Sequence, residues 1–329
     1  MTDKILILDF GSQYTQLIAR RVREAQVYCE IKPWNAAEAD FLDPNTRGVI
    51  LSGGPLSVYA ENAPKIPAAI LQSDLPILGI CYGMQALTVQ LGGEVTPAQE
   101  HEYGLATIQV LVPNPLLPEG EMTVWMSHGD RIKRQPPGWQ VLARSANSPI
   151  AAIGNLEQRR FGLQFHPEVR HTPQGAQILR RFVIDICGCK GDWTPASIIE
   201  QSVTSIRAQV GQGLVLSAVS GGVDSSVATA LAQRALGEQV YSVFIDTGLL
   251  RKGERQQVET TFRPLLGERL MVVDASERFL SALEGVTDPE TKRKIIGETF
   301  IREFEAAARQ IGPIEYLVQG TIYPDVVES

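Results

Sequence analysis

The sequence has no apolar run close to the roughly 20 residues that a helix needs to cross a bilayer, so we expect no membrane insertion. Its first residues lead directly into a strand-like run, without the features of a secretion signal. Only four cysteines occur in 329 residues, which argues against a disulfide scaffold and favours the reducing cytoplasm. Positive charge is scarce too: 30 Lys and Arg face 37 Asp and Glu, which argues against a nucleic-acid-binding surface.

What is present is ordinary globular sequence, long enough for two domains. In the first half, apolar runs alternate with helical patterns, which predicts a parallel sheet covered on both faces. Shorter strand-like stretches with many turn residues follow and predict a mixed sheet. The expected strands lie at 4–10, 48–52, 76–80, 105–112, 122–126 and 161–165, and the expected helices at 15–26, 82–91 and 174–186.

The second half begins a new α/β pattern after a linker at 187–195. We expect strands at 214–219, 240–245, 270–273 and 316–318, and helices at 225–236, 253–265 and 290–310. The predicted fold class is α/β, with two doubly wound domains in series. The predicted domains are residues 1–192 and 193–329.

The first candidate site is Cys81, which stands between an expected strand and an expected helix with Gly79 and Gly83 on either side. Glycines allow the sharp turn that exposes a nucleophile. The N-terminus of the following helix favours a negative charge on the sulfur and offers N–H groups to an oxyanion. The alternative is a small buried core cysteine, the more common fate of a lone cysteine.

A thiolate nucleophile needs a base, and the chain has four histidines. His166 directly follows an expected strand, and Glu168 stands two positions on, which suits a base with its orienting carboxylate. A surface histidine beside an unrelated glutamate is the alternative. Gly53 and Gly54 follow another expected strand and are a natural source of a second oxyanion N–H, or are simply a tight turn.

Three segments together resemble the class I glutamine amidotransferases: GICYGMQ at 79–85, FHPE at 165–168 and SGGP at 52–55. The resemblance covers residues 4 to about 190. It implies that Cys81 attacks the glutamine amide, that His166 protonates departing ammonia and that Glu168 holds His166 in place. The oxyanion-binding and glutamine-binding residues that it implies are Gly53, Gly54, Tyr82, Gln85, Ser127, His128 and Asp130.

The second candidate site is the loop SGGVDSS, which follows an expected strand and opens a helix. Backbone N–H groups and hydroxyls at such a point form an anion cradle. The loop lacks the Gly-Lys-Ser/Thr ending of the Walker A motif, so a leaving pyrophosphate is a more natural ligand than a transferred γ-phosphate. The alternative is a helix start with Ser and Asp caps. The candidate ATP-binding residues are Ser220, Gly221, Gly222, Val223, Asp224, Ser225 and Ser226, with Asp224 as a ligand for Mg²⁺.

This loop resembles the ATP pyrophosphatase loop shared by several adenylating enzymes. Together with the segments at 125–130, 243–251, 288–297 and 319–325, it makes the chain resemble the GMP synthase family. The resemblance implies glutamine, ATP and xanthosine monophosphate (XMP) as substrates, and amination of XMP to GMP with release of AMP and pyrophosphate. Arg293 is the candidate contact to XMP, although a basic run on a helix is usually a solvated face.

The resemblance also implies a longer protein, because the family continues beyond this point with a mobile basic loop and a C-terminal dimerisation domain. We therefore expect a glutaminase and an incomplete ATP site. Neither full GMP synthesis nor the family's homodimer carries over to residues 1–329 alone. The alternatives are a different synthetase with the same loop, such as a relative of NAD synthetase, a cysteine hydrolase acting on peptides or aldehydes, and a non-catalytic nucleotide-binding or regulatory module.

Overall fold

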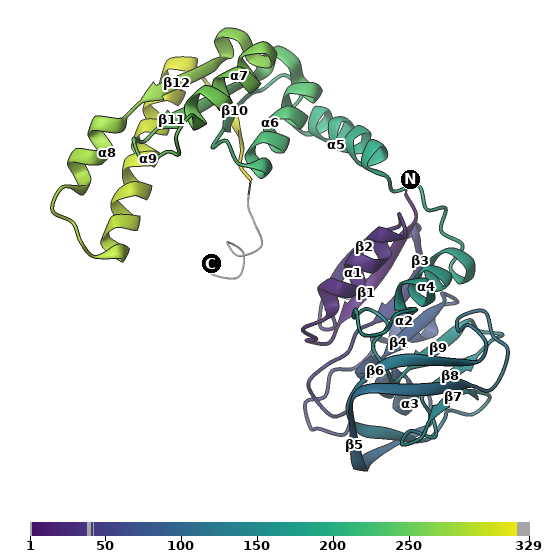
Figure 1. Cartoon of the computed structure of the whole chain (residues 1–329). Coiled ribbons are helices and arrows are strands. Elements are labelled where there is room, and N and C mark those ends of the chain that lie inside the picture. The colour runs from purple at the N-terminus through teal and green to yellow at the C-terminus, as the bar shows by residue number, and fades with distance from the viewer. Residues whose placement is uncertain (1, 38–40, 42, 321–329) are drawn as a thin grey trace. The chain divides into compact units, whose positions relative to one another are not determined.

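The computed structural model of the chain describes residues 2–37, 41 and 43–320. It divides into two compact units, Met1–Thr194 and Pro195–Ser329, each with its own sheet and core (Figure 1). No helix within the described ranges is long and apolar enough to cross a membrane.

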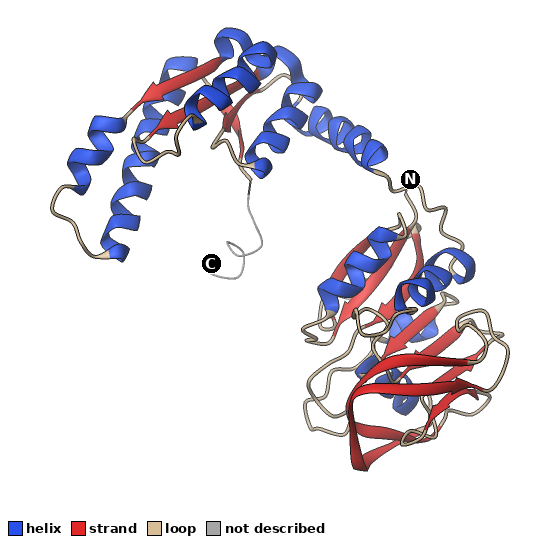
Figure 2. Cartoon of the chain, viewed as in Figure 1, coloured by secondary structure: helices blue, strands red, loops and turns tan. Residues whose placement is uncertain are grey.

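A nine-stranded sheet forms the centre of the first unit, with the order β2-β1-β3-β4-β9-β8-β7-β5-β6. Its first five strands are parallel and the remaining four pair antiparallel, which gives the mixed sheet seen in Figure 2. The strands are β1 (Lys4–Asp9), β2 (Tyr28–Pro33), β3 (Thr46–Leu51), β4 (Ile77–Ile80), β5 (Glu94–Val110), β6 (Glu121–Arg134), β7 (Gln140–Ser145), β8 (Ala152–Asn155) and β9 (Arg160–Leu163).

Helices cover both faces of the parallel part of this sheet, as its unbroken apolar strands require. Alternate residues of β1 point to opposite faces: Ile5 and Ile7 join one buried cluster, and Leu6 and Leu8 join the other. The first cluster is covered by α1 (Thr15–Glu24), α4 (Gly175–Arg180) and the π-helical turn η2 (Arg181–Ile186), and the second by α2 (Ala68–Gln72) and α3 (Tyr82–Gln90).

The antiparallel part differs from the sequence-based expectation in extent. The expected strands at 105–112 and 122–126 are the central pieces of a long hairpin, β5 and β6, that pairs from Glu94 to Arg134. The pairing is interrupted by a register shift between Pro97 and Glu102, and this irregularity hides the continuous strand from a period-two pattern. The expected helix at 174–186 is α4 followed by η2 rather than one regular helix.

The second unit contains a four-stranded parallel sheet with the order β12-β11-β10-β13. Its strands are β10 (Leu214–Ala218), β11 (Val240–Asp246), β12 (Leu270–Asp274) and β13 (Ile314–Val318). One face packs against α5 (Pro195–Val210), α6 (Val223–Leu236) and α7 (Glu254–Leu266), and the other against α8 (Ser276–Leu283) and α9 (Pro289–Ile311). Short 3₁₀ turns, η3 (Gly237–Gln239) and η4 (Gly267–Arg269), lead from α6 and α7 into the next strands.

The predicted α/β class with two wound sheets in series is therefore confirmed. Several elements were not predicted: β2, β7, β8, α2, α5 and α8. Four of them, β2, β7, β8 and α2, span only four to six residues, which is too few for a clear apolar periodicity.

Candidate functional site

Cys81 stands on a strained turn between β4 and α3. Its backbone has φ of 50° and ψ of −105°, and positive φ is costly for a residue with a side chain. The turn is possible because both neighbouring glycines lie against backbone. A Cβ on Gly79 would lie 2.6 Å from the nitrogen of Met84, and a Cβ on Gly83 would lie 2.5 Å from the carbonyl oxygen of Leu51. The two glycines thus allow α3 to pack closely against the strands, so that the first turn of α3 begins beside the Cys81 sulfur.

Polar groups from two other segments surround the Cys81 sulfur. The thiol donates toward the carbonyl oxygen of Ser127 at 3.6 Å, and the Gln164 amide donates toward the sulfur at 3.8 Å. The ring of His166 is a further hydrogen-bonding partner of the Cys81 side chain. The fold therefore brings the predicted nucleophile and the predicted base together.

His166 is held from both sides. Its Nδ1 lies 2.7 Å from Oε1 of Glu168, and both side chains are almost completely buried. Its backbone N–H donates to the carbonyl of Trp125 at 3.0 Å, and its carbonyl accepts from the Thr172 hydroxyl at 2.7 Å. The ring therefore has a fixed position and, because Nδ1 faces the carboxylate, leaves Nε2 for the sulfur.

The charge state of His166 follows from these contacts. Burial alone lowers its pKa, but hydrogen bonds to Cys81 and Glu168, together with their negative charges, raise the pKa of His166 to about 10. A protonated imidazole beside the sulfur stabilises negative charge that develops on the sulfur.

The loop at 52–55 lies beside both the base and the first turn of α3. A Cβ on Gly53 would lie 3.4 Å from Cε1 of His166, and one on Gly54 would lie 3.1 Å from the Tyr82 ring. The carbonyl of Ser52 accepts from Gly83 N–H at 3.0 Å, which ties the loop to α3. The residues predicted for the oxyanion thus lie within one small region around Cys81.

A cleft of about 490 Å³ opens over Cys81. Of the predicted glutamine-binding residues, it is lined by Gly54, Tyr82, Gln85, Ser127, His128 and Asp130. Gln85 Nε2 donates to the carbonyl of Asp130 at 3.3 Å, which joins α3 to the 127–130 segment of β6. The cleft is large enough for an amino-acid side chain with polar groups at both ends.

Sequence reasoning missed three residues around this cleft. The Tyr59 hydroxyl donates to Asp130 Oδ1 at 2.6 Å across the cleft, and Gln164 contacts both Cys81 and Gln85. Glu102 lies opposite His128 in the β5–β6 pairing. Of these three residues, only Gln164 could have been found from the sequence. It stands two positions before His166, and residues two apart in an extended segment lie on the same face.

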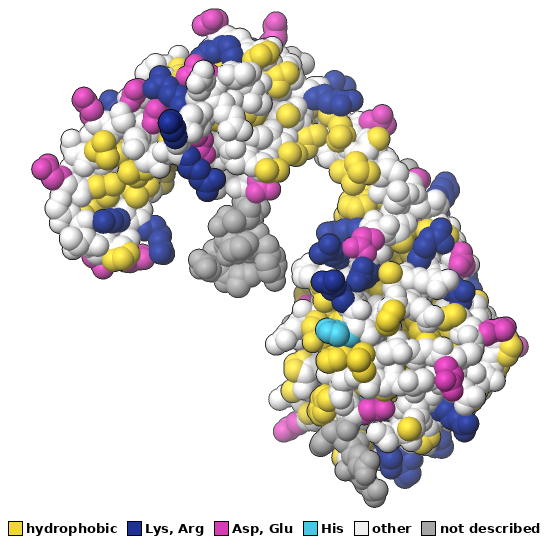
Figure 3. All heavy atoms as spheres, viewed as in Figure 1, with side chains coloured by type: hydrophobic (Ala, Val, Ile, Leu, Met, Phe, Trp, Pro, Cys, Tyr) yellow, Lys and Arg dark blue, Asp and Glu magenta, His cyan; other side chains and the backbone are white. Residues whose placement is uncertain are grey.

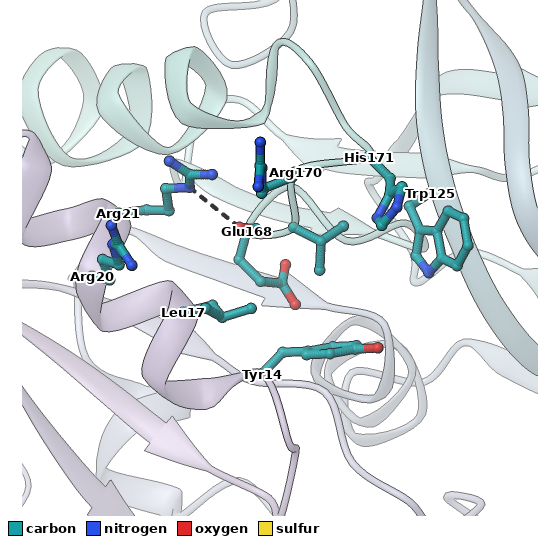
Figure 4. Close-up of a pocket in the computed structure, with 9 residues that line it drawn as sticks. Tyr14, Leu17, Arg20, Arg21, Trp125, Glu168, Arg170 and His171 are labelled. Atoms are coloured by element: carbon teal, nitrogen blue, oxygen red, sulfur yellow. Dashed lines mark hydrogen bonds between the residues drawn. The ribbon is translucent and has the colours of Figure 1, made fainter. Parts of the chain in front are cut away.

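Glu168 also lines a second cavity, of about 500 Å³ (Figure 4). Arg20 and Arg21 of α1, Arg170 and Trp125 line it, and Arg21 Nε donates to the backbone carbonyl of Glu168 at 3.2 Å. Figure 3 shows Lys and Arg side chains gathered over α1. The backbone at Glu168 is thus held by Arg21, at the edge of a basic surface.

In the second unit, the SGGVDSS loop connects β10 to α6, which begins at Val223. Gly221 has φ of +79°, and the loop is held by its own serines: Ser225 Oγ accepts from Ser220 N–H at 3.2 Å, and Ser226 Oγ donates to the carbonyl of Gly222 at 2.7 Å. The first N–H groups of α6 have no acceptor within the helix, so an anion suits this end.

The residues present fit a polyphosphate better than a free metal ion. Asp224 is in the first turn of α6, and no group of three or more His, Cys, Asp or Glu in the described chain could hold a metal by itself. Mg²⁺ typically binds one or two carboxylates and the phosphates of the substrate, which is compatible with Asp224 alone. Of the 319–325 motif, residues 321–325 lie outside the described residues.

Arg293 lies on α9 with a side chain that is 78% exposed, paired with Glu290 at 3.2 Å. The structure does not bring it near any other predicted site residue. An exposed arginine paired with a glutamate on the same helix is also what an ordinary solvated helix surface shows.

Comparison with known families decides how the first unit is classified. Residues 6–186 match the family Glutamine amidotransferase class-I, which is more than half of the chain. The chain belongs to the class I glutamine amidotransferase family. Residues 196–300 of this amidotransferase match a second family, NAD synthase.

Curated relatives match this amidotransferase along almost its whole length. It is 54% identical over 330 residues to the GMP synthase [glutamine-hydrolyzing] of Thermomicrobium roseum and 55% identical over 331 residues to that of Symbiobacterium thermophilum. Each match covers 99% of this chain but 62% and 64% of the relative, so the chain spans less than two thirds of their length.

Among solved structures, a GMP synthase subunit protein from Thermoplasma acidophilum is 31% identical, with a TM-score of 0.51. The match covers 61% of this amidotransferase chain and 98% of the other chain.

Proposed function

We propose that this chain is the front part of a glutamine-dependent GMP synthase, in which residues 1–192 release ammonia from glutamine and residues 193–329 begin the ATP-dependent unit that uses it. The observation that carries the proposal is Cys81 at a strained strand–helix turn, in contact with His166, which Glu168 orients. The likeness of the chain to GMP synthases over 99% of its length supports the choice of synthetase.

In the proposed glutaminase reaction, the Cys81 thiolate attacks the carboxamide carbon of glutamine and the carbonyl oxygen becomes an oxyanion. His166 gives its proton to the leaving nitrogen as the C–N bond breaks, which releases ammonia and leaves a glutamyl thioester. Water then attacks the thioester, His166 takes one of its protons, and the C–S bond breaks to release glutamate. Glu168 stabilises the imidazolium and fixes the ring.

The oxyanion is stabilised by N–H groups of the Gly53–Gly54 loop and of Tyr82 at the start of α3. Gln85, Ser127, His128 and Asp130 hold the glutamine substrate in the cleft. Gly54, Tyr82, Gln85, Ser127, His128 and Asp130 line one cleft together with Cys81, which supports this division of roles.

In the second unit, ATP transfers its AMP group to the C2 oxygen of XMP with release of pyrophosphate, and ammonia then displaces AMP to give GMP. Residues 220–226 bind the phosphates of ATP, Asp224 holds Mg²⁺ against them, and Arg293 contacts XMP. Mg²⁺, held by Asp224 and the phosphates of ATP, would supply positive charge against the pyrophosphate. Delivery within one protein keeps ammonia unprotonated and protects the adenylated intermediate from water.

We further propose a cytoplasmic enzyme of purine nucleotide biosynthesis whose full-length form is a homodimer. The four cysteines are free and buried, which is compatible with a reducing compartment.

A second candidate is a glutamine-dependent NAD synthetase, favoured by the family match of residues 196–300. An assay of ammonia release from glutamine separates the candidates when it is run with ATP plus XMP and with ATP plus nicotinic acid adenine dinucleotide. We expect ammonia release without nucleotide or with stimulation by ATP plus XMP. Stimulation by the dinucleotide alone contradicts the choice of synthetase. Formation of GMP is measured on a chain extended at its C-terminus to the length of the relatives.

A further inference from the structure

A buried pair of ionisable side chains, Glu102 and His128, lies beside the proposed glutamine cleft. Glu102 of β5 and His128 of β6 face each other in the antiparallel register, and their side chains are only 10% and 3% exposed. Oε2 of Glu102 lies 3.4 Å from Nε2 of His128. Because both side chains are buried, a polar atom of either one that lacks a hydrogen-bonding partner is costly. The position of the protons on the two groups therefore matters.

The other ring nitrogen of His128 fixes the tautomer. Its Nδ1 lies 3.0 Å from the carbonyl oxygen of Asp130, and a carbonyl can only accept, so Nδ1 carries a proton. In the neutral ring, Nε2 then has a lone pair and no proton. Oε2 of Glu102 lies on that side, at 3.4 Å, and Nε2 has no hydrogen-bonding partner among the described residues.

Glu102 receives one hydrogen bond from its surroundings, and the donor is Ser145 rather than His128. The Ser145 hydroxyl donates to the Glu102 carboxyl group at 3.0 and 3.2 Å to its two oxygens. Ser145 Oγ itself accepts from Ser148 N–H at 2.9 Å, so its only proton points to Glu102. A bare carboxylate facing the lone pair of Nε2 would place two acceptors against each other in a buried site, and one further proton between them removes the conflict.

We propose that Glu102 and His128 share one proton between Oε2 and Nε2, and that this pair positions the 127–130 segment for glutamine. The inference rests on the proposed glutaminase. Three contacts link the pair to the cleft: the Ser127 carbonyl accepts from the Cys81 thiol, and the Asp130 carbonyl accepts from both His128 and Gln85. Glu102 is a positioning residue, since it reaches the cleft only through His128.

The groups that face His128 oppose each other electrostatically. Burial lowers the pKa of His128, the negative charge of Glu102 and the hydrogen bond to Asp130 raise it, and the charge of His166 lowers it. Tyr59 holds the Asp130 side chain rather than the ring. The net effect lowers the pKa of His128 from its ordinary value, so the shared proton is lost as the pH rises and the segment loosens with that loss.

The test compares Glu102→Gln with Glu102→Ala. The amide that Glu102→Gln introduces can donate to Nε2 and accept from Ser145, so it replaces the proton without being able to lose one. We expect Glu102→Ala to raise KM for glutamine about tenfold with a smaller change in kcat, because binding is lost more than chemistry. We expect Glu102→Gln to keep KM within about threefold of wild type and to abolish the rise in KM with pH.

A readout independent of activity is the ¹⁵N spectrum of the histidine rings, which is simple because the chain has four histidines. We expect Nδ1 of His128 to carry a proton, and Nε2 to show one pH-dependent step that Glu102→Gln removes. A bare Nδ1, or an unchanged step in Glu102→Gln, overturns the shared proton. If the spectrum behaves as expected but Glu102→Ala leaves KM unchanged, the positioning role is wrong. If the wild-type chain hydrolyses no glutamine at all, the proposed function fails while the spectrum still tests the pair.

Discussion

Oε1 of Glu168 lies 2.7 Å from Nδ1 of His166, whereas its Oε2 has no hydrogen-bonding partner among the described residues. A buried carboxylate with one unsatisfied oxygen is costly, and its nearest compensation is a positive charge on the ring. The pair is therefore built to stabilise the imidazolium rather than the neutral imidazole.

Replacing Glu168 with Gln tests this charge effect. The amide keeps an acceptor for Nδ1 but removes the negative charge, so we expect kcat for glutamine hydrolysis to fall roughly 10²- to 10⁴-fold with little change in KM. Steady-state ammonia release measures both constants. Glu157→Gln, on an exposed turn, is the matched control and is expected to keep wild-type values. A Glu168→Gln variant with wild-type kcat would show that the carboxylate is structural only.

The raised pKa of His166 predicts a specific pH dependence of stability. Because its folded pKa, about 10, lies above the ordinary value of 6.5, its contribution is fully present below pH 6.5 and is lost as the pH rises toward 10. We expect the free energy of unfolding of the first unit to fall over that window in denaturant titrations. In Cys81→Ala the fall is smaller, because a partner that raises the pKa is absent. An identical pH dependence in both proteins would contradict the assigned contact between Cys81 and His166.

Gly83 predicts a large local cost for the smallest substitution. A Cβ there would lie 2.5 Å from the Leu51 carbonyl oxygen and 2.7 Å from its Cβ, so α3 has to move away from the sheet. We expect Gly83→Ala to destabilise the first unit by about 2 kcal/mol or more and to reduce glutamine hydrolysis.

The control for this substitution is Gly297→Ala, at an exposed position of α9 where a Cβ meets nothing within 4 Å. There alanine is expected to stabilise the second unit by about 0.5–1 kcal/mol, because it is the better helix former. Unfolding in denaturant measures both changes. A Gly83→Ala variant as stable as wild type would mean that α3 is not pressed against β3.

The phosphate-binding loop is tested with two glycines of similar backbone conformation. Gly221 has φ of +79° and Gly285 has φ of +72°, so alanine at either position costs on the order of 1 kcal/mol of stability. Only Gly221 lies in the proposed ATP site. We expect Gly221→Ala to weaken the binding of Mg-ATP, measured by calorimetry, about tenfold or more, and Gly285→Ala to leave it unchanged. Equal affinities in the two variants would place the nucleotide elsewhere.

The fold was predictable where local pattern and packing agree. The run at 4–10 is apolar on both faces because β1 is buried on both, so a continuous apolar sequence indicated a central parallel strand. The Cys81 turn was predictable because Gly79 and Gly83 leave no room for a Cβ, and only such a pair permits the close approach.

The rest of the cleft depends on long-range register. Glu102 meets His128 only because the β5–β6 pairing shifts between Pro97 and Glu102, and such a shift has no sequence signal of its own. Likewise, Tyr59 reaches Asp130 from a loop 71 residues away in sequence. Sequence motifs thus identified the candidate site residues at the ends of strands. The residues that hold those side chains in place could not be predicted, because they come together only through tertiary pairing.

The central claim, that Cys81 is the nucleophile of a glutaminase, is tested most directly by ammonia release from glutamine in wild type, Cys81→Ala and Cys29→Ala. Cys29 is the control because it is also a buried free cysteine, but its thiol donates to the Ala19 carbonyl away from the cleft. The account predicts release by wild type and Cys29→Ala, and a loss of at least about 10³-fold in Cys81→Ala. Ammonia release by Cys81→Ala at the wild-type rate would contradict it.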